Sequence, residues 1–169
     1  CGRNPIRLRI GSGAPRVAGL LVQREGIVAA LCTLELEVLK TEEVSFLSVS
    51  KDQLPVYACE VLDRLLAGES NLLAIGVARA VSVDLRSFLE ERYRLPVIVD
   101  EDGASAAQAE KLLGAGQEAD DFVYVGLGDH ISSGIISGGK VLRSARGAGS
   151  GAEGPAAPGA VLRHERPLQ

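Results

Sequence analysis

The chain has 169 residues, of which 46% are hydrophobic, and its formal net charge is −4. This length and apolar content suffice for a buried core in one domain, or in one domain with a small appendage. The acidic balance argues against nonspecific nucleic-acid binding by this chain, because phosphate contacts require clustered Lys and Arg.

Three short apolar segments between residues 16 and 42 predict an antiparallel meander. They read RVAGLLVQ, GIVAALCT and LELEVLKTE, and residues 24–26 form a turn between the first two. In the third segment Leu34, Leu36 and Val38 alternate with polar residues, as is typical of an outer strand with one face in water.

Two helices and a strand are predicted next. The first helix is amphipathic, with Asp52 as its N-cap, Pro55 in its first turn and Gly68 at its end. The continuous apolar run at 72–78 predicts a strand that is covered on both faces. The second helix carries apolar residues at helical spacing and ends before Pro96.

The remaining segments complete a mixed α/β pattern. PVIVD predicts a buried strand, GASAAQAEKLLG a third helix, and DFVYVGLG, ISSGIIS and KVLRS three further strands, with Gly138-Gly139 as a hairpin turn. The predicted order is βββ-α-β-α-β-α-βββ, with helices that cross over between strands of a sheet. Residues 149–169 are rich in Gly, Ala and Pro and predict a poorly ordered tail.

Cysteine spacing and hydropathy both favour a cytoplasmic protein. Cys1, Cys32 and Cys59 show no CxxC spacing, so they predict neither a zinc knuckle nor a disulfide framework. No apolar stretch approaches the roughly 18 residues that span a membrane, and no signal peptide is evident. We therefore expect no membrane contact. Because the chain starts at Cys1 and contains no Met, we also expect a segment in front of it.

An acidic cluster between the strand at 96–100 and the third helix is the main candidate site. Asp102 is well placed to N-cap a helix that begins near Gly103, to act as a general base, or to bind a ligand, and the pattern leaves these roles open. His130 has no partner at metal-ligand spacing, which favours an ordinary turn residue. No residue is predicted to bind a metal.

Several of these segments together resemble the ROK family, which contains sugar-responsive transcriptional repressors and sugar kinases. They are LLAIGVA, LPVIVDEDGASAAQAE and SGIISGGKVLRSARGA, and the opening GRNPIRLRI is similar to the connector that follows the winged helix-turn-helix in the repressors. The resemblance implies an actin-like ATPase (ribonuclease H-like) fold, with a mixed βββαβα sheet, helices packed on it and a truncated second half. It divides the chain into a connector at 1–15, actin-like subdomains at 16–78 and 79–148, and the tail at 149–169.

The resemblance also assigns roles within the acidic cluster. The family motif VENDANAAALAE is matched by VDEDGASAAQAE, so Asp102 stands at the family's catalytic base and Glu101 at the Asn that holds the sugar. Glu101 and Asp102 are therefore the expected substrate-binding residues. An ionised Glu only accepts hydrogen bonds, whereas Asn also donates them.

The phosphate-binding motifs depart from the family pattern. Leu21-Val22-Gln23 stands where the family has DIG in its first glycine turn. In the second turn GDHISSGI replaces GTGIGAGI, which leaves Gly128, Asp129 and Gly134 as phosphate-loop remnants, and a carboxylate at Asp129 would repel phosphate.

Other family motifs are missing. The GEIGH and CxCGxxGC motifs have no counterpart, so no zinc is expected, and a segment that is longer in the family is almost absent between Ala80 and Val83.

The combined pattern favours the effector-binding and dimerisation domain of a ROK-type transcriptional regulator with degraded kinase motifs. Such a domain would form a homodimer, respond to a sugar, need no cofactor and reach DNA only through a domain upstream of this chain. One alternative is a sugar kinase that uses Mg-ATP to phosphorylate a hexose or related sugar, with Asp102 as base. Another is a ligand-independent scaffold. The sequence leaves open whether the chain is an enzyme.

Overall fold

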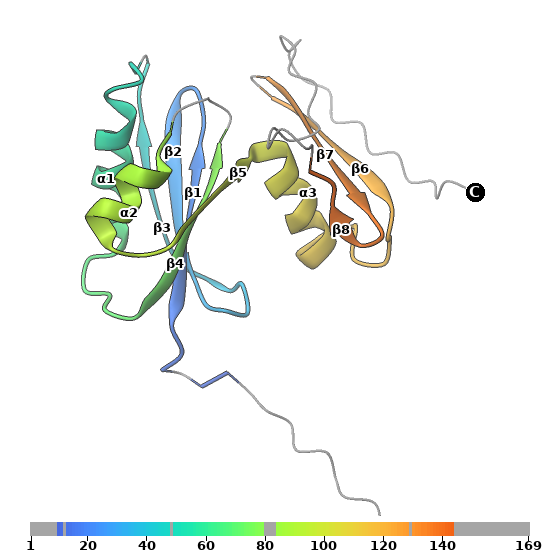
Figure 1. The fold of residues 1–169 in the computed structure, drawn as a ribbon, viewed down its shortest axis with the longest axis horizontal. Helices are drawn as coiled ribbons and strands as arrows, with labels where there is room; N and C mark the ends of the chain where they lie inside the picture. Colours follow the sequence, from blue (N-terminus) through green and yellow to red (C-terminus); the bar gives the residue numbers. More distant parts are fainter. Residues whose placement is uncertain (1–9, 12, 48, 80–83, 129, 144–169) are drawn as a thin grey trace, which may run out of the picture.

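Two β-sheets organise the chain in the computed structural model, which describes residues 10–11, 13–47, 49–79, 84–128 and 130–143 (Figure 1). The first sheet has the strand order β3-β2-β1-β4-β5, and the second has the order β6-β7-β8. The elements are β1 (Arg16–Val22), β2 (Gly26–Cys32), β3 (Val38–Ser45), α1 (Leu54–Leu65), β4 (Leu72–Arg79), α2 (Arg86–Tyr93), β5 (Val97–Glu101), α3 (Asp102–Leu113), β6 (Phe122–Leu127), β7 (Ile131–Ser137) and β8 (Lys140–Val141).

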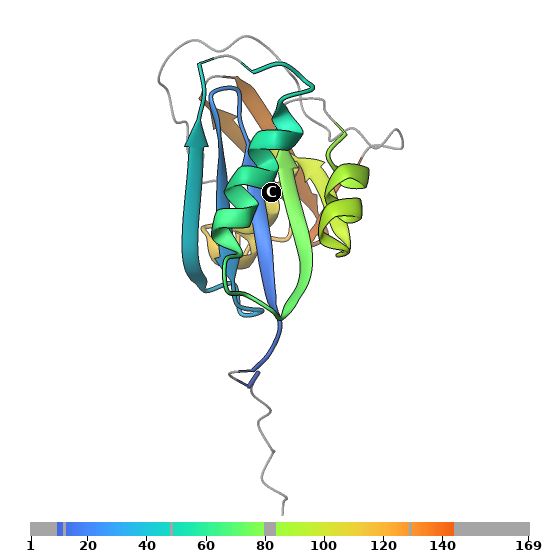
Figure 2. The same cartoon turned by 90° about the vertical axis from the view of Figure 1, so that its left-hand side faces the viewer.

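The first sheet combines a meander with two parallel strands. β1 pairs antiparallel with β2, and β2 pairs antiparallel with β3. β4 and β5 are reached through α1 and α2, and they extend the sheet parallel to β1. Both helices lie on the same face of the sheet, as Figure 2 shows. This placement is expected when successive crossovers move in one direction and share one hand.

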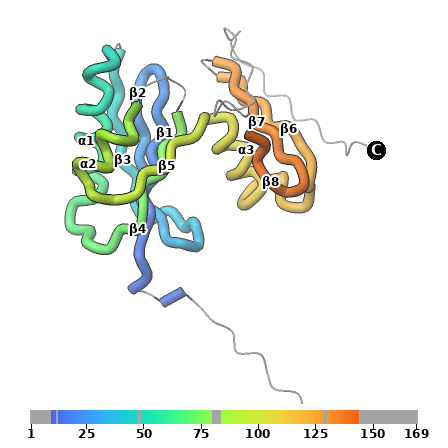
Figure 3. The backbone as a smooth tube through the Cα atoms, viewed as in Figure 1, coloured from blue at the N-terminus to red at the C-terminus, as the bar shows by residue number. Residues whose placement is uncertain are grey.

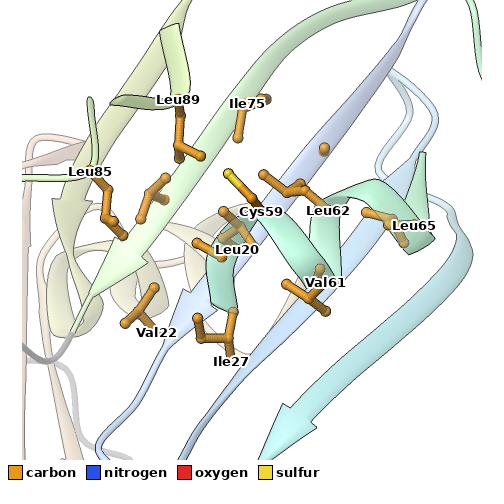
Figure 4. Packing of buried hydrophobic residues seen from close by; sticks show 14 of the residues in the cluster. Leu20, Val22, Ile27, Cys59, Val61, Leu62, Leu65, Ile75, Leu85 and Leu89 are labelled. Atoms are coloured by element: carbon orange, nitrogen blue, oxygen red, sulfur yellow. The ribbon is translucent and has the colours of Figure 1, made fainter. Parts of the chain in front are cut away.

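The core lies between this face and the two helices. Val61, Leu62 and Leu65 of α1 and Leu89 of α2 are fully buried against the sheet (Figure 4). On β1, Ala18, Leu20 and Val22 alternate toward the helices because successive side chains of a strand point to opposite faces. Aliphatic burial therefore holds the first sheet and its helices together.

The third helix belongs with the second sheet (Figure 3). Its first turn touches β7 backbone to backbone: a Cβ atom added to Gly103 would lie 2.3 Å from the carbonyl oxygen of Ser133. A Cβ atom added to Gly134 would lie 2.2 Å from the carbonyl oxygen of Gly103. Both distances are far below van der Waals contact, so α3 can lie this close to β7 only because glycine occupies both positions.

The order of elements confirms the predicted βββ-α-β-α-β-α-βββ pattern. The predicted hairpin turn is also confirmed, since Gly138 and Gly139 have φ values of 56° and 75°. Positive φ at both central residues is the type I′ geometry that matches the twist of paired strands.

The predicted start of the third strand is wrong. Residues 34–37 form a turn in which the Leu36 N–H donates to the Thr33 carbonyl and the Thr33 N–H to the Glu37 carbonyl. Leu36 adopts φ 66°, a left-handed conformation that is unfavourable for leucine. The alternation of Leu34, Leu36 and Val38 therefore came partly from a turn, and β3 begins only at Val38.

The predicted N-cap of the first helix is also wrong. Gln53, not Asp52, occupies the cap position of α1, and its side chain makes no hydrogen bond to the first turn. Instead, Gln53 Oε1 accepts hydrogen bonds from the backbone N–H and the hydroxyl of Ser50. Pro55 lies in the first turn as predicted, where its missing N–H has no partner to lose.

The division between the sheets differs from the expected subdomain boundary at 78/79. β5 pairs with β4, so the first sheet extends to Glu101 and the second begins after α3. Most of the connector at 1–15, the whole tail at 149–169 and the short 80–83 segment lie outside the described residues. Among the helices that are described, none is long and apolar enough to cross a membrane.

Candidate functional site

Three consecutive acids occupy the point where the chain passes from the first sheet to α3. Asp100 and Glu101 are the last residues of β5, and Asp102 is the first residue of α3. We refer to these three residues as the acidic junction. Because the strand alternates and the helix then turns, their side chains leave the backbone in different directions.

Each acid of the junction contacts a basic side chain from a different element. Asp102 Oδ2 lies 2.7 Å from Nε2 of His130, which precedes β7. Glu101 Oε1 lies 4.0 Å from Nη2 of Arg79 at the end of β4. Asp100 Oδ2 lies 2.5 Å from Nη2 of Arg143, just after β8. Hydrogen bonding to Asp100 raises the pKa of the Arg143 guanidinium.

The Asp102 carboxylate is engaged by His130 and does not cap the helix. The cap position is held by Glu101, which has extended backbone angles and makes no side-chain cap bond. An ionised carboxylate can only accept, so the ring nitrogen of His130 donates. The side chains of Asp102 and His130 are 20% and 23% exposed, so both are partly accessible to solvent.

His130, which the sequence suggested to be an ordinary turn residue without a metal-ligand partner, thus has a hydrogen-bonding partner in Asp102. His130 and Asp102 are separated by 28 residues in the sequence. They meet because α3 and β7 are in backbone contact through Gly103 and Gly134. The one sequence signal for this contact is the pair of glycines.

The junction shares one edge of the first sheet with the first predicted phosphate turn. The strand register aligns Val22 with Arg79 and Arg79 with Glu101. The carboxyl ends of three parallel strands, β1, β4 and β5, thus meet at this edge, which is where open α/β sheets bind ligands. At the same edge Leu21 is 37% exposed and Gln23 follows β1, so aliphatic and amide side chains stand where the family resemblance expects Asp and Gly.

The predicted phosphate-loop remnants lie in different environments. Gly128 is exposed in the connection between β6 and β7, and its N–H donates to the carbonyl of His130 at 3.3 Å. Gly134 lies inside β7 and is buried against α3, so packing alone accounts for a glycine there. Asp129 lies outside the described residues.

A depression of 440 Å³ lies at the end of the meander and is lined in part by Gln23, Ile27 and Phe46. No residue of the acidic junction lines it. The described residues also contain no group of three or more His, Cys, Asp or Glu side chains that could hold a metal ion. The polar chemistry of interest is therefore that of the acidic junction and its three basic partners.

The five-stranded sheet with α1 and α2 on one face, followed by α3 and a second meander, is the actin-like ATPase fold. The model of the ROK family matches residues 69–153, and the chain belongs to this family.

Relatives in sequence include both kinases and repressors. The chain is 36% identical over 80 residues to a beta-glucoside kinase of Listeria monocytogenes, a match that covers 46% of this chain and 27% of the kinase. It is 31% identical over 65 residues to the xylose repressor of Bacillus subtilis, which covers 38% of this chain and 17% of the repressor. The chain thus matches only about a quarter of the kinase's length.

Solved structures show the same division. A ROK family glucokinase from Streptomyces griseus, in complex with glucose and AMPPNP, has a TM-score of 0.69 at 25% identity, covering 84% of this chain and 48% of the glucokinase. A ROK family transcriptional regulator, a homologue of the E. coli MLC protein, has a TM-score of 0.71 at 20% identity, covering 82% and 40%. The fold is thus common to enzymes and regulators, and the choice between them depends on the site.

Proposed function

We propose that the chain is the effector-binding and dimerisation part of a ROK-type transcriptional regulator in which phosphoryl transfer has been lost. The observation that carries this proposal is the 2.7 Å contact between Asp102 Oδ2 and His130 Nε2. A general base must lie within about 2.6–3.2 Å of the hydroxyl that it deprotonates. In this chain the imidazole of His130 occupies that position at Oδ2 of Asp102. The family resemblance expects a glycine in place of His130.

The first phosphate turn supports the loss of phosphoryl transfer. Enzymes transfer phosphoryl groups almost entirely by positioning them and by stabilising the developing charge. Leu21 and Gln23 supply neither the carboxylate that organises a metal-phosphate group nor the bare glycine backbone that approaches a phosphate closely. An ATP molecule at this edge would therefore find little to orient it.

The acidic junction supports retained binding of a neutral polar ligand. Carboxylates accept hydrogen bonds from hydroxyl groups, and Glu101 and Asp102 are only about one-third and one-fifth exposed. A sugar is the ligand class that agrees with the xylose repressors among the relatives. In this proposal the domain pairs with a second copy of itself. DNA is bound by a part of the protein outside this chain, because this chain has a net charge of −4.

Thermal unfolding with separate ligands tests the proposal. D-xylose or D-glucose at about 100 times its dissociation constant should stabilise the chain by about 2.7 kcal/mol, which raises the Tm by roughly 5–10 °C. Mg-ATP should leave the Tm unchanged. Glu101→Gln should reduce the increase in Tm that the sugar causes. Asp121→Asn changes an acid that accepts a hydrogen bond from the Ser137 hydroxyl in the second sheet, and it should preserve the increase.

A sugar kinase is the second candidate, and the match to a beta-glucoside kinase together with the retained Asp102 favours it. It predicts stabilisation by Mg-ATP and sugar-dependent ATP consumption that Asp102→Ala abolishes. If neither Mg-ATP nor a sugar changes the Tm, both candidates are wrong and a ligand-independent scaffold is left.

A further inference from the structure

The packing of β7 against α3 places His130 beside Asp102. The residue immediately precedes β7, and β7 is in backbone contact with the first turn of α3, where Asp102 lies. Gly103 and Gly134 allow this contact because neither carries a Cβ atom. The imidazole is therefore held beside the carboxylate by two regular elements whose separation is fixed.

This contact occupies one of the two carboxylate oxygens to which a ligand hydroxyl could donate. Asp102 only accepts hydrogen bonds, and in the structure Oδ2 accepts one from His130 at 2.7 Å. No ligand atom fits between two groups at that distance. A hydroxyl that approaches Oδ2 from the side held by the imidazole must therefore displace the ring or tilt it away.

We propose that His130 competes with the effector for Asp102 and thereby sets the affinity of the site. This inference rests on the proposed function, because it concerns the same carboxylate and the same neutral sugar ligand. His130 is then a positioning residue that holds Asp102 in the absence of ligand and yields the carboxylate when ligand binds.

The competition has a distinctive consequence for substitutions. Removing the imidazole frees Asp102, so His130→Ala should bind sugar more tightly, by about tenfold, the factor expected for one charge-assisted hydrogen bond. A residue that only maintains the local structure would give the opposite result, because its loss would loosen the site. His130→Gln retains an N–H donor for Asp102 and should restore an affinity near that of the original chain.

Isothermal titration calorimetry with D-xylose and D-glucose measures these affinities for the full chain and the two His130 variants. Ser132→Ala is the matched control, since it changes a side chain two residues away on β7 without touching the contact to Asp102. Tighter binding by His130→Ala, with His130→Gln and Ser132→Ala near the original value, is the expected result. Equal or weaker binding by His130→Ala would overturn the inference.

A second measurement follows the His130 ring in the original chain, and a variant serves only to assign its signals. The chain contains two histidines, so the imidazole NMR signals of His130 can be assigned by their absence in His130→Gln. Saturation with the sugar should shift these signals as the ring leaves Asp102, and unchanged signals at saturation would overturn the inference. If neither sugar binds the original chain or His130→Ala, the proposed function fails together with the inference. If sugars bind with no dependence on His130, only the inference fails.

Discussion

Replacing Gly134 with alanine would separate packing from phosphate binding as the reason for this glycine. The added Cβ would lie 2.2 Å from the Gly103 carbonyl oxygen and 2.7 Å from the Ala107 Cβ. Neither neighbour is the flexible end of a long side chain, so α3 and β7 must move apart to admit the methyl group. Overpacking of this kind destabilises a protein by about 1–3 kcal/mol.

The expected loss is at the upper end of that range, because backbone atoms of a helix and a strand relax less easily than side chains. For a chain of this size, about 3 kcal/mol corresponds to a decrease in Tm of roughly 6–12 °C. Gly76→Ala is the matched control, since its Cβ would lie 3.9 Å from the nearest neighbouring atom, the Ala18 carbonyl oxygen, at ordinary contact distance.

Urea unfolding monitored by circular dichroism gives the free energy of both variants. Hydrogen exchange of peptides from α3 and β7 then localises the loss to the second sheet. A Gly134→Ala chain whose free energy of unfolding equals that of the original chain would refute the packing argument. If that variant were stable but had lost a Mg-ATP effect present in the original chain, Gly134 would be a functional phosphate-loop residue.

Three further predictions follow from local geometry. Leu36→Gly should stabilise the chain by about 1 kcal/mol in urea unfolding, because Leu36 has φ 66° and glycine adopts this conformation without a steric penalty; a lower free energy of unfolding would contradict the strain argument. Burial raises the pKa of the Cys59 thiol above its ordinary value of 9.0, so folding disfavours the thiolate and the free energy of unfolding should fall as the pH rises past about 9. Iodoacetamide at pH 8 should therefore label the Cys59 peptide far more slowly in the folded chain than in the urea-unfolded chain, and equal labelling rates would contradict this prediction. Tyr93→Phe should lower the stability by about 1 kcal/mol in thermal unfolding, because the hydroxyl donates to Asp63 Oδ1 at 2.8 Å and so links α2 to α1, and an unchanged Tm would show that this bond contributes nothing.

The order of elements could be predicted because the apolar residues repeat with the period of a helix or a strand. The turn at residues 34–37 could not, since Leu34 and Leu36 imitate strand alternation and the left-handed residue is a leucine. Turns are found in a sequence mainly through glycine, proline and asparagine, and this turn has none of them.

The candidate site was predictable only in part. Arg79 and Glu101 are in contact because the parallel strands β4 and β5 end at the same edge of the sheet. The sequence pattern already suggests two such strands. The His130–Asp102 contact depends on how closely α3 approaches β7. The glycines that set this approach look the same in a sequence whether they admit a helix or a phosphate group.

The direct passage from β5 into α3 has a mechanical consequence. Glu101 is extended, with φ −69° and ψ 147°, and the next residue is already helical, so no loop separates the two elements. Within the described residues the chain crosses between the sheets once, at this peptide bond. Asp100 contacts Arg143, which follows the second sheet. Glu101 contacts Arg79 of the first sheet, and Asp102 contacts His130 beside the second sheet. The orientation of the two sheets therefore depends on the backbone torsion angles of the acidic junction, and a molecule bound to its side chains would contact residues that join both halves of the chain.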